Sequence, residues 1–259
     1  MYSNYNLCLA MTANFQNYIE QFKTWFLIYN ENYNYRINLS TNMPELFEDF
    51  KYDNLFIYST KELISRCEST FEDESVLLNE VRYREYPWHS HRHIVKECFE
   101  QGYSRVMAID SDIYINIDKK SLEDKIDNTI VNSISTTQSI WCCGESEKWE
   151  GQNFEHYLDR DTIHWVDKFN EKYGTNINMR GFCSYDGPDI LYNMDSTTYK
   201  KFFELWDVMA EFDYKWYPYP VPPQRIYIAL NSLLNMDTHY YGGGGLFMEK
   251  KHDQNIHYK

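Results

Sequence analysis

The sequence is poor in glycine and proline and has no long apolar run. Its 259 residues include only 10 Gly and 7 Pro, which excludes collagen-like and linker-type compositions. Near the N-terminus, the apolar run from Leu7 to Met11 is far shorter than the roughly 20 residues that a membrane span requires. We therefore expect a soluble intracellular protein, located in the cytoplasm, or in the host cytoplasm if the source is a virus.

The six cysteines also lack the patterns of zinc sites and disulfide-rich scaffolds. None of them forms a CxxC pair, and a chain of this size does not need disulfide bonds to stabilise its fold. Reduced thiols are therefore expected. The adjacent Cys142 and Cys143 are interpreted as small buried apolar residues rather than as metal ligands.

Basic residues are outnumbered by acidic residues. The chain has 25 Lys and Arg against 39 Asp and Glu, which gives a formal net charge of −14 at pH 7. Such a surface repels polyanions on average, so nucleic acid is not the first partner to expect. A local basic groove or a bound divalent cation can still reverse the potential where a phosphate binds.

Apolar residues make up 43% of the chain and aromatic residues 18%, enough for a substantial buried core. Strands are predicted near residues 7–11, 35–39, 54–58 and 105–109. Helices are predicted near residues 15–29, 61–67, 91–99, 197–212 and 224–234. This alternation predicts an α/β fold with a mostly parallel sheet. Because no linker is evident, we expect a single domain whose second half is elaborated.

A pair of carboxylates follows the clearest predicted strand. Arg105 to Ile109 forms an apolar strand that leads directly into Asp110-Ser111-Asp112. Ligands of open α/β sheets bind at the carboxyl ends of the strands, and hard divalent cations such as Mg²⁺ and Mn²⁺ prefer carboxylate oxygens. The pattern therefore indicates a metal site that also binds substrate phosphates. The alternative is an ordinary turn, because Asp-Ser-Asp is also common in turns.

Residues Gly102 to Ile113 resemble the signature strand of the GT-A fold glycosyltransferases, closest in pattern to the glycogenin-like and bacterial galactosyltransferase-like branch. The resemblance implies a single GT-A type domain over residues 1–259, with a Rossmann-like, mostly parallel central sheet flanked by helices. Residues 1–118 would form the nucleotide-sugar-binding half, and residues 119–259 the acceptor half with a C-terminal metal and diphosphate loop. It further implies that Asp110 and Asp112 hold Mn²⁺ or Mg²⁺ against the donor diphosphate, with Ser111 as a donor-binding residue beside them.

Two other stretches are implied to belong to the donor site. Leu7 to Asn14 is similar to the first strand and loop that cradle the nucleotide base in this family, and the helix before the Asp-x-Asp strand carries a basic residue near the donor. Each basic side chain on this helix could equally be a solvated charge on the helix face. The donor-site candidates from the two stretches are Thr12, Ala13, Asn14, Arg92 and Lys96.

The C-terminal region supplies further metal and donor candidates. Met236 to Gly242 is similar to the late His-x-x-Gly of the family, so His239 is the implied third metal ligand, and it would suit Mn²⁺ better than Mg²⁺. The alternative is a histidine that is merely hydrogen-bonded. Gly242 begins a glycine run that permits close approach to a diphosphate. Lys250 would pair with the phosphates, unless it is only a charge of the C-terminal tail.

The acceptor pocket is implied by a segment of the second half. Cys183 to Asn193 is similar to the family segment that lines the sugar and acceptor pocket, although Asp-Gly-Pro stands where the family more often has Asn-x-Gly. Asp186 and Asp189 are the candidate catalytic carboxylates; one would deprotonate the acceptor hydroxyl in an inverting enzyme, or stabilise the oxocarbenium-like centre in a retaining one. Gly187 and Gln224 are acceptor-binding candidates. The alternative for this segment is an ordinary turn.

Three alternating histidines, His89, His91 and His93, would share one face of a strand and could form a transition-metal site there. The stretch runs directly into the apolar helical pattern that begins at Ile94. We therefore expect a helix, on which the three side chains splay apart, and no zinc site.

Together these observations predict a metal-dependent hexosyl- or pentosyltransferase that moves a sugar from a nucleoside diphosphate sugar to a hydroxyl acceptor. A UDP-sugar is the first donor to expect. The expected acceptor is a glycan or a small molecule, with hydroxymethylated pyrimidines of phage DNA as an alternative. From other classes, a non-catalytic carbohydrate-binding module could explain the aromatic content, but it would not need the carboxylate pair. A nucleotidyltransferase would need a Gly-rich loop that is not found near the N-terminus.

Overall fold

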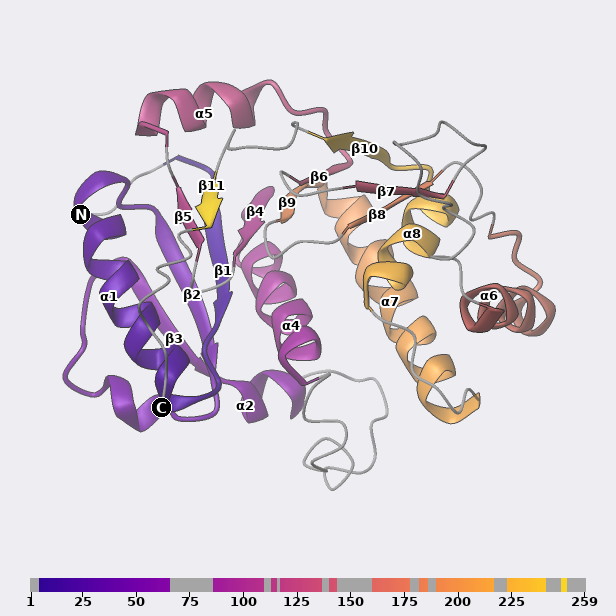
Figure 1. The fold of residues 1–259 in the computed structure, drawn as a ribbon, viewed down its shortest axis with the longest axis horizontal. Coiled ribbons are helices and arrows are strands. Elements are labelled where there is room, and N and C mark those ends of the chain that lie inside the picture. Colours follow the sequence, from indigo (N-terminus) through magenta and orange to yellow (C-terminus); the bar gives the residue numbers. More distant parts are fainter. Residues whose placement is uncertain are drawn as a thin grey trace.

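The computed structural model describes residues 5–65, 86–109, 113–115, 117–136, 140–143, 160–177, 182–185, 190–216, 223–240 and 248–250. Strands and helices alternate along the first half of the chain, as the sequence predicts (Figure 1). The elements of this half are β1 (Cys8–Thr12), α1 (Gln16–Asn32), β2 (Arg36–Thr41), the short 3₁₀ helix η1 (Pro44–Phe47), β3 (Leu55–Ser59), α2 (Thr60–Ser65), α4 (Tyr86–Glu100), β4 (Arg105–Ala108) and β5 (Ile113–Ile115).

The second half is less regular. Its elements are α5 (Lys119–Asp127), β6 (Ser133–Thr136), β7 (Ile140–Cys143), α6 (Arg160–Tyr173), β8 (Phe182–Tyr185), β9 (Ile190–Asn193), α7 (Ser196–Trp216), α8 (Pro223–Leu234), β10 (Asp237–Tyr240) and β11 (Met248–Lys250). The predicted helices near residues 197–212 and 224–234 are confirmed as α7 and α8. The short strands of this half were not predicted.

A seven-stranded sheet forms the centre of the molecule, in the order β10-β6-β9-β4-β1-β2-β3. β1 is parallel to β2 and β4, β2 is parallel to β3, and β6 is parallel to β10. β9 is antiparallel to both of its neighbours, β4 and β6. All strands of the sheet except β9 therefore run in the same direction. This confirms the predicted α/β fold with a mostly parallel sheet flanked by helices.

We call the side of the sheet on which these strands end the carboxyl edge. The strands that reach it include β1, which ends at Thr12, β2, which ends at Thr41, and β4, which ends at Ala108. Because β9 runs in the opposite direction, it begins at this edge, and its first residue, Ile190, is the register partner of Ala108. The segments that follow β1, β2 and β4, and the segment that precedes β9, therefore lie at the same edge of the sheet.

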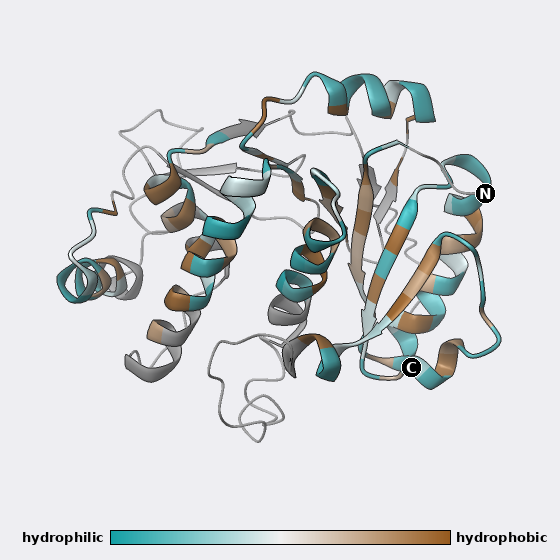
Figure 2. Ribbon diagram, turned by 180° about the vertical axis from the view of Figure 1, so that it is seen from behind, coloured by the Kyte–Doolittle hydropathy of each residue, from teal (hydrophilic) through white to brown (hydrophobic). Residues whose placement is uncertain are grey.

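β1 is buried on both faces, which explains why its sequence is a continuous apolar run. Cys8 and Ala10 pack into one core cluster with residues of α4, α6, α7 and α8. Leu9 and Met11 pack into a second cluster with residues of α1 and α5. Figure 2 shows hydrophobic residues on the strands and alternating hydrophobic and hydrophilic bands along the helices. The sheet thus separates two apolar layers, each covered by helices.

Helix α1 shows why the sequence pattern predicted its position. Its buried side chains recur at steps of three and four residues and face the sheet; they are Ile19, Phe22, Trp25, Phe26 and Tyr29. Helix α4 is followed by Gly102, whose φ of 92° lies in a region that glycine adopts without the penalty of a Cβ atom. The turn places the chain at the start of β4.

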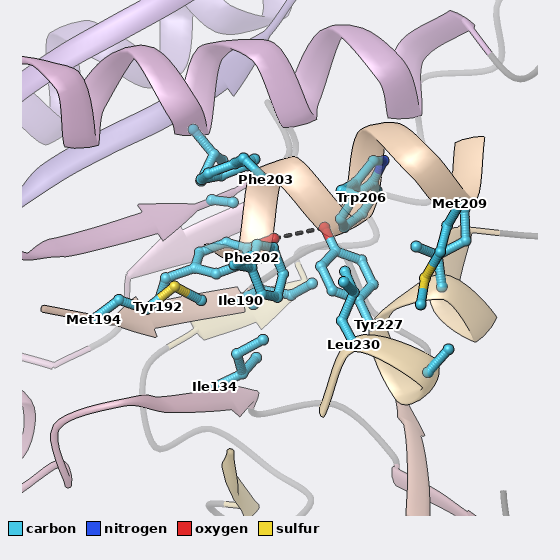
Figure 3. Packing of buried hydrophobic residues seen from close by; sticks show 14 of the residues in the cluster. Ile134, Ile190, Tyr192, Met194, Phe202, Phe203, Trp206, Met209, Tyr227 and Leu230 are labelled. Carbon is cyan, nitrogen blue, oxygen red and sulfur yellow. Dashed lines mark hydrogen bonds between the residues drawn. The ribbon is translucent and has the colours of Figure 1, made fainter. Parts of the chain in front are cut away.

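Aromatic side chains fill the core of the second half. Tyr192 of β9, Phe202 and Trp206 of α7, and Tyr227 of α8 pack together (Figure 3). The hydroxyls of Tyr192 and Tyr227 are 2.5 Å apart and form a buried hydrogen bond. Trp165 and Trp206 are also buried, so these tryptophans belong to the core.

Within the residues that the structure describes, no helix is long and apolar enough to span a membrane. In the same residues, no group of three or more His, Cys, Asp or Glu side chains is arranged as a metal site. His91 and His93 lie in helix α4, as predicted, and both are buried. Cys8 and Cys98 are buried free thiols.

Candidate functional site

The loop after β1 lies at the carboxyl edge and is fixed to the end of β2. The Ala13 N–H donates to the Ser40 carbonyl at 3.0 Å, and the Thr41 hydroxyl donates to the Ala13 carbonyl at 2.6 Å. Ala13 and Asn14 are buried and Thr12 is half-buried. The three donor-site candidates therefore lie together at the end of β1: Thr12 is its last residue, and Ala13 and Asn14 follow in a loop whose backbone is hydrogen-bonded to β2.

The side chain of Asn14 is hydrogen-bonded within this region. Thr60, the first residue of α2, donates its hydroxyl hydrogen to Asn14 Oδ1 at 3.1 Å. Thr60 Oγ1 also lies 2.8 Å from Ser40 Oγ. All three residues are buried. The ends of β1, β2 and β3 are thus joined by a chain of polar side chains directly beneath the carboxyl edge.

Helix α4 brings a histidine against the same strand. The Nε2 atom of His91 lies 3.4 Å from the carbonyl oxygen of Ala10 in β1. Burial lowers the pKa of His91 to about 4, although the hydrogen bond to Ala10 acts in the opposite direction. The ring is therefore neutral at pH 7, and because a carbonyl only accepts, Nε2 carries the hydrogen.

Arg92 is buried rather than solvated, so the alternative of a helix-face charge is wrong for this residue. Its guanidinium forms an ion pair with Asp207 of α7, while Nε and Nη1 have no hydrogen-bond partner among the described residues. Burial raises the pKa of Asp207, an effect that Arg92 partly opposes. Lys96 is half-buried and lies 3.7 Å from Glu100 on its own helix, which fits a helix-face charge.

The Asp-x-Asp segment, residues 110–112, lies outside the described residues, but both of its flanks are placed. Ile109 is buried and donates its N–H to the Ala10 carbonyl at 3.1 Å. Ile113 begins β5, which pairs with β11 so that Lys250 is the register partner of Ile113. The donor candidate Lys250 therefore lies on the strand beside the residue that follows Asp112.

The segment with the catalytic and acceptor candidates Asp186, Gly187 and Asp189 also lies outside the described residues. It joins β8 to β9, and β9 begins at the carboxyl edge with Ile190 opposite Ala108. The described flanks of the two predicted carboxylate segments are thus adjacent across one strand pair. This juxtaposition was not predicted, since strand pairing between distant segments leaves no local signal in the sequence.

The remaining candidates are more scattered. His239 lies in β10 and is the register partner of Ser135; β6 and β9 separate β10 from β4, a lateral distance of roughly 14 Å at the usual strand spacing. Gln224 is in the first turn of α8. Gly242 lies outside the described residues. The metal role of His239 and the acceptor role of Gln224 stay predictions.

Sequence reasoning missed several polar residues that the structure brings to this region. They are Ser40, Thr41, Thr60, His91 and Asp207. Ser40 and Thr41 end a largely buried strand, β2, and Thr60 follows β3. Because parallel strands end at a common edge, polar residues at the end of each buried strand were a usable signal. Asp207 carried no such signal, since its partner lies on another helix.

No protein-family model matches this sequence, and a search of curated proteins found no match. Among solved structures, the chain is similar to the apo form of mouse xyloside xylosyltransferase 1. The similarity has a TM-score of 0.46 and a sequence identity of 10%, and it covers 90% of this chain and 83% of that chain. A similarity at this level does not assign a function.

Proposed function

We propose that the chain is a metal-dependent glycosyltransferase that takes a sugar from a nucleoside diphosphate sugar and transfers it to a hydroxyl of a glycan or a small molecule. One observation carries the proposal. At the carboxyl edge, the flank of the Asp-x-Asp segment at Ile109, the flank of the second carboxylate segment at Ile190, and the buried polar loop after β1 are neighbours.

The proposed roles are those that the family resemblance implies, and this arrangement is compatible with them. The loop at Thr12 to Asn14 would bind the nucleoside part of the donor. Asp110 and Asp112 would hold Mn²⁺ or Mg²⁺, because paired carboxylates after a buried strand supply the oxygen ligands that these ions prefer. The bound metal would neutralise the charge that develops on the diphosphate leaving group. Asp186 or Asp189 would serve the acceptor side, and Lys250 would lie beside the diphosphate.

A thermal-shift experiment tests the donor site. The wild-type protein is screened with UDP, GDP, ADP, CDP and dTDP, each with and without Mn²⁺, because a ligand that binds only the folded state raises the melting temperature. We expect stabilisation by one nucleotide that requires Mn²⁺ and that is lost in Asp112→Asn.

The matched control for this experiment is Asp124→Asn. Asp124 is an exposed carboxylate that pairs with Lys120 on α5, away from the carboxyl edge. This variant should keep the full metal-dependent shift. An equal shift in the Asp112→Asn variant, or no metal-dependent shift with any nucleotide, would contradict the proposal. Stabilisation by glycans alone, without metal or nucleotide, would instead indicate a carbohydrate-binding module.

A further inference from the structure

The hydroxyl of Thr41, the last residue of β2, joins two segments at the carboxyl edge. It donates to the Ala13 carbonyl at 2.6 Å and accepts from the Met43 N–H at 3.2 Å. Both directions are fixed by the partners, because a carbonyl oxygen can only accept and a backbone N–H can only donate. The Thr41 side chain therefore links the loop after β1 to the segment that leaves β2.

The loop after β1 is also tied to β2 through its backbone. The Ala13 N–H donates to the Ser40 carbonyl at 3.0 Å, so both backbone polar groups of Ala13 bond to the end of β2. Thr41 is 0% exposed and Ala13 is 1% exposed. Bulk water does not reach this contact, so loss of the hydroxyl would leave the buried Ala13 carbonyl without a compensating bond to solvent.

A second threonine makes the same pair of bonds at the opposite edge of the sheet. The Thr129 hydroxyl donates to the Ile126 carbonyl at 2.6 Å and accepts from the side-chain amide of Asn193 at 2.8 Å. Asn193 is the last residue of β9, which begins at the carboxyl edge and so ends at the other one. Thr129 is buried as well. The two threonines thus differ in what they hold: only Thr41 holds a segment of the candidate donor site.

We propose that Thr41 is a positioning residue for the nucleoside part of the sugar donor: it fixes the backbone of the loop at Thr12 to Asn14, so that the donor meets this loop in one conformation. The proposal rests on the proposed function, and it assigns nucleoside recognition to a loop clamped by β2, separate from the metal site that binds the diphosphate. A loop that is held before binding does not have to be ordered on binding, which strengthens affinity. Thr41 acts through the loop and not by contact, because its side chain is buried.

The test compares Thr41→Val, which keeps the shape and removes the hydroxyl, with Thr41→Ser, which keeps the hydroxyl. Calorimetry measures the affinities for UDP, GDP, ADP, CDP, dTDP and pyrophosphate, each with Mn²⁺. For the nucleotide that binds the wild type best, Thr41→Val should lose about fivefold in affinity, because the freed loop must be ordered on binding. Thr41→Ser should stay within about twofold of the wild type. Pyrophosphate affinity should be unchanged in both variants.

The matched control is Thr129→Val, which removes the same kind of hydroxyl at the opposite edge of the sheet. Both valine variants should lower the melting temperature to a similar extent, but Thr129→Val should keep the wild-type nucleotide affinity. If Thr41→Val does not fold, Thr41→Cys replaces it, because a thiol is a weaker hydrogen-bond donor than a hydroxyl. The nucleotide affinity should again fall, with pyrophosphate affinity unchanged.

Four results would each overturn the inference. They are an unchanged nucleotide affinity in the variant that lacks the Thr41 hydroxyl, an equal loss in the Thr41 and Thr129 variants, a loss that serine does not restore, and a parallel loss of pyrophosphate affinity. Absence of nucleotide binding by the wild type overturns the proposed function itself, so the two failures are distinguishable.

Discussion

His91 is the residue whose ionisation should be most visible in the stability of the fold. Its ring is buried against β1, and burial lowers its pKa to about 4, whereas an unfolded histidine titrates near 6.5. Between these two pH values, the histidine is protonated in the unfolded chain and neutral in the folded chain. The stability from this residue is complete above pH 6.5 and decreases as the pH falls towards 4, by about 3 kcal/mol over that window.

The variant His91→Gln tests this effect, because glutamine can donate to the Ala10 carbonyl but does not titrate. Urea unfolding between pH 7 and 4.5 should show a smaller loss of the free energy of unfolding for this variant than for the wild type. His164→Gln changes an exposed histidine of α6 and should follow the wild-type curve. Parallel curves for wild type and His91→Gln would show that His91 does not contribute.

At the scale of elements, the ion pair between Arg92 and Asp207 joins α4 to α7. α4 packs against β1 in the first half of the chain, and α7 belongs to the second. A buried guanidinium without its carboxylate is strongly disfavoured, so Asp207→Leu should lower the free energy of unfolding by about 3–5 kcal/mol. The pair of half-buried Arg105 and exposed Asp127 is the control, and Asp127→Ala should cost only about 1 kcal/mol, because the carboxylate that it removes is exposed to water.

Chemical denaturation of these two variants measures both values. A double variant, Arg92→Met with Asp207→Leu, should recover much of the lost stability, because no charge is left buried without a partner. If Asp207→Leu costs no more than Asp127→Ala, the Arg92–Asp207 pair is not a significant link between the helices.

The elements also show what could be read from the sequence. β1, α1 and β4 were predictable because each is a local pattern: an apolar run buried on both faces, or apolar residues at steps of three and four. The antiparallel position of β9 between β6 and β4 was not predictable. β9 runs only from Ile190 to Asn193, and so short a segment does not indicate which strands it pairs with. The burial of Arg92 depends on α7, far away in the chain, and left no local signal either.

One part of the candidate site could likewise be predicted from the sequence, and another part could not. The interest of Asp110 after β4 follows from the rule that ligands bind where parallel strands end, whereas Thr12 to Asn14 became candidates only through the resemblance to the glycosyltransferase family. The contacts that join Ser40 and Thr60 to Asn14 depend on which strands are neighbours, and this order was not known from the sequence. The pairing of β4 with β9, which places Ile190 opposite Ala108 and so next to Ile109, likewise depends on the order of the strands in the sheet and not on any motif.

At the scale of the whole molecule, the net charge of −14 shapes how phosphate can be bound. A surface of this sign disfavours polyanions, which argues against DNA as the acceptor. It is compatible with a diphosphate that enters together with a divalent cation, because the ion supplies the local positive charge. Metal dependence and nucleotide binding should therefore be inseparable in this protein.

The central claim is tested most directly by turnover. The protein is incubated with a panel of nucleotide sugars and Mn²⁺, and release of the nucleoside diphosphate is followed by mass spectrometry, with and without added hydroxyl acceptors. We predict that one nucleotide sugar is cleaved, that chelation of the metal stops the reaction, and that Asp110→Ala abolishes it while keeping the wild-type fold. Cleavage that persists in Asp110→Ala or after chelation would contradict the account, as would no cleavage of any nucleotide sugar.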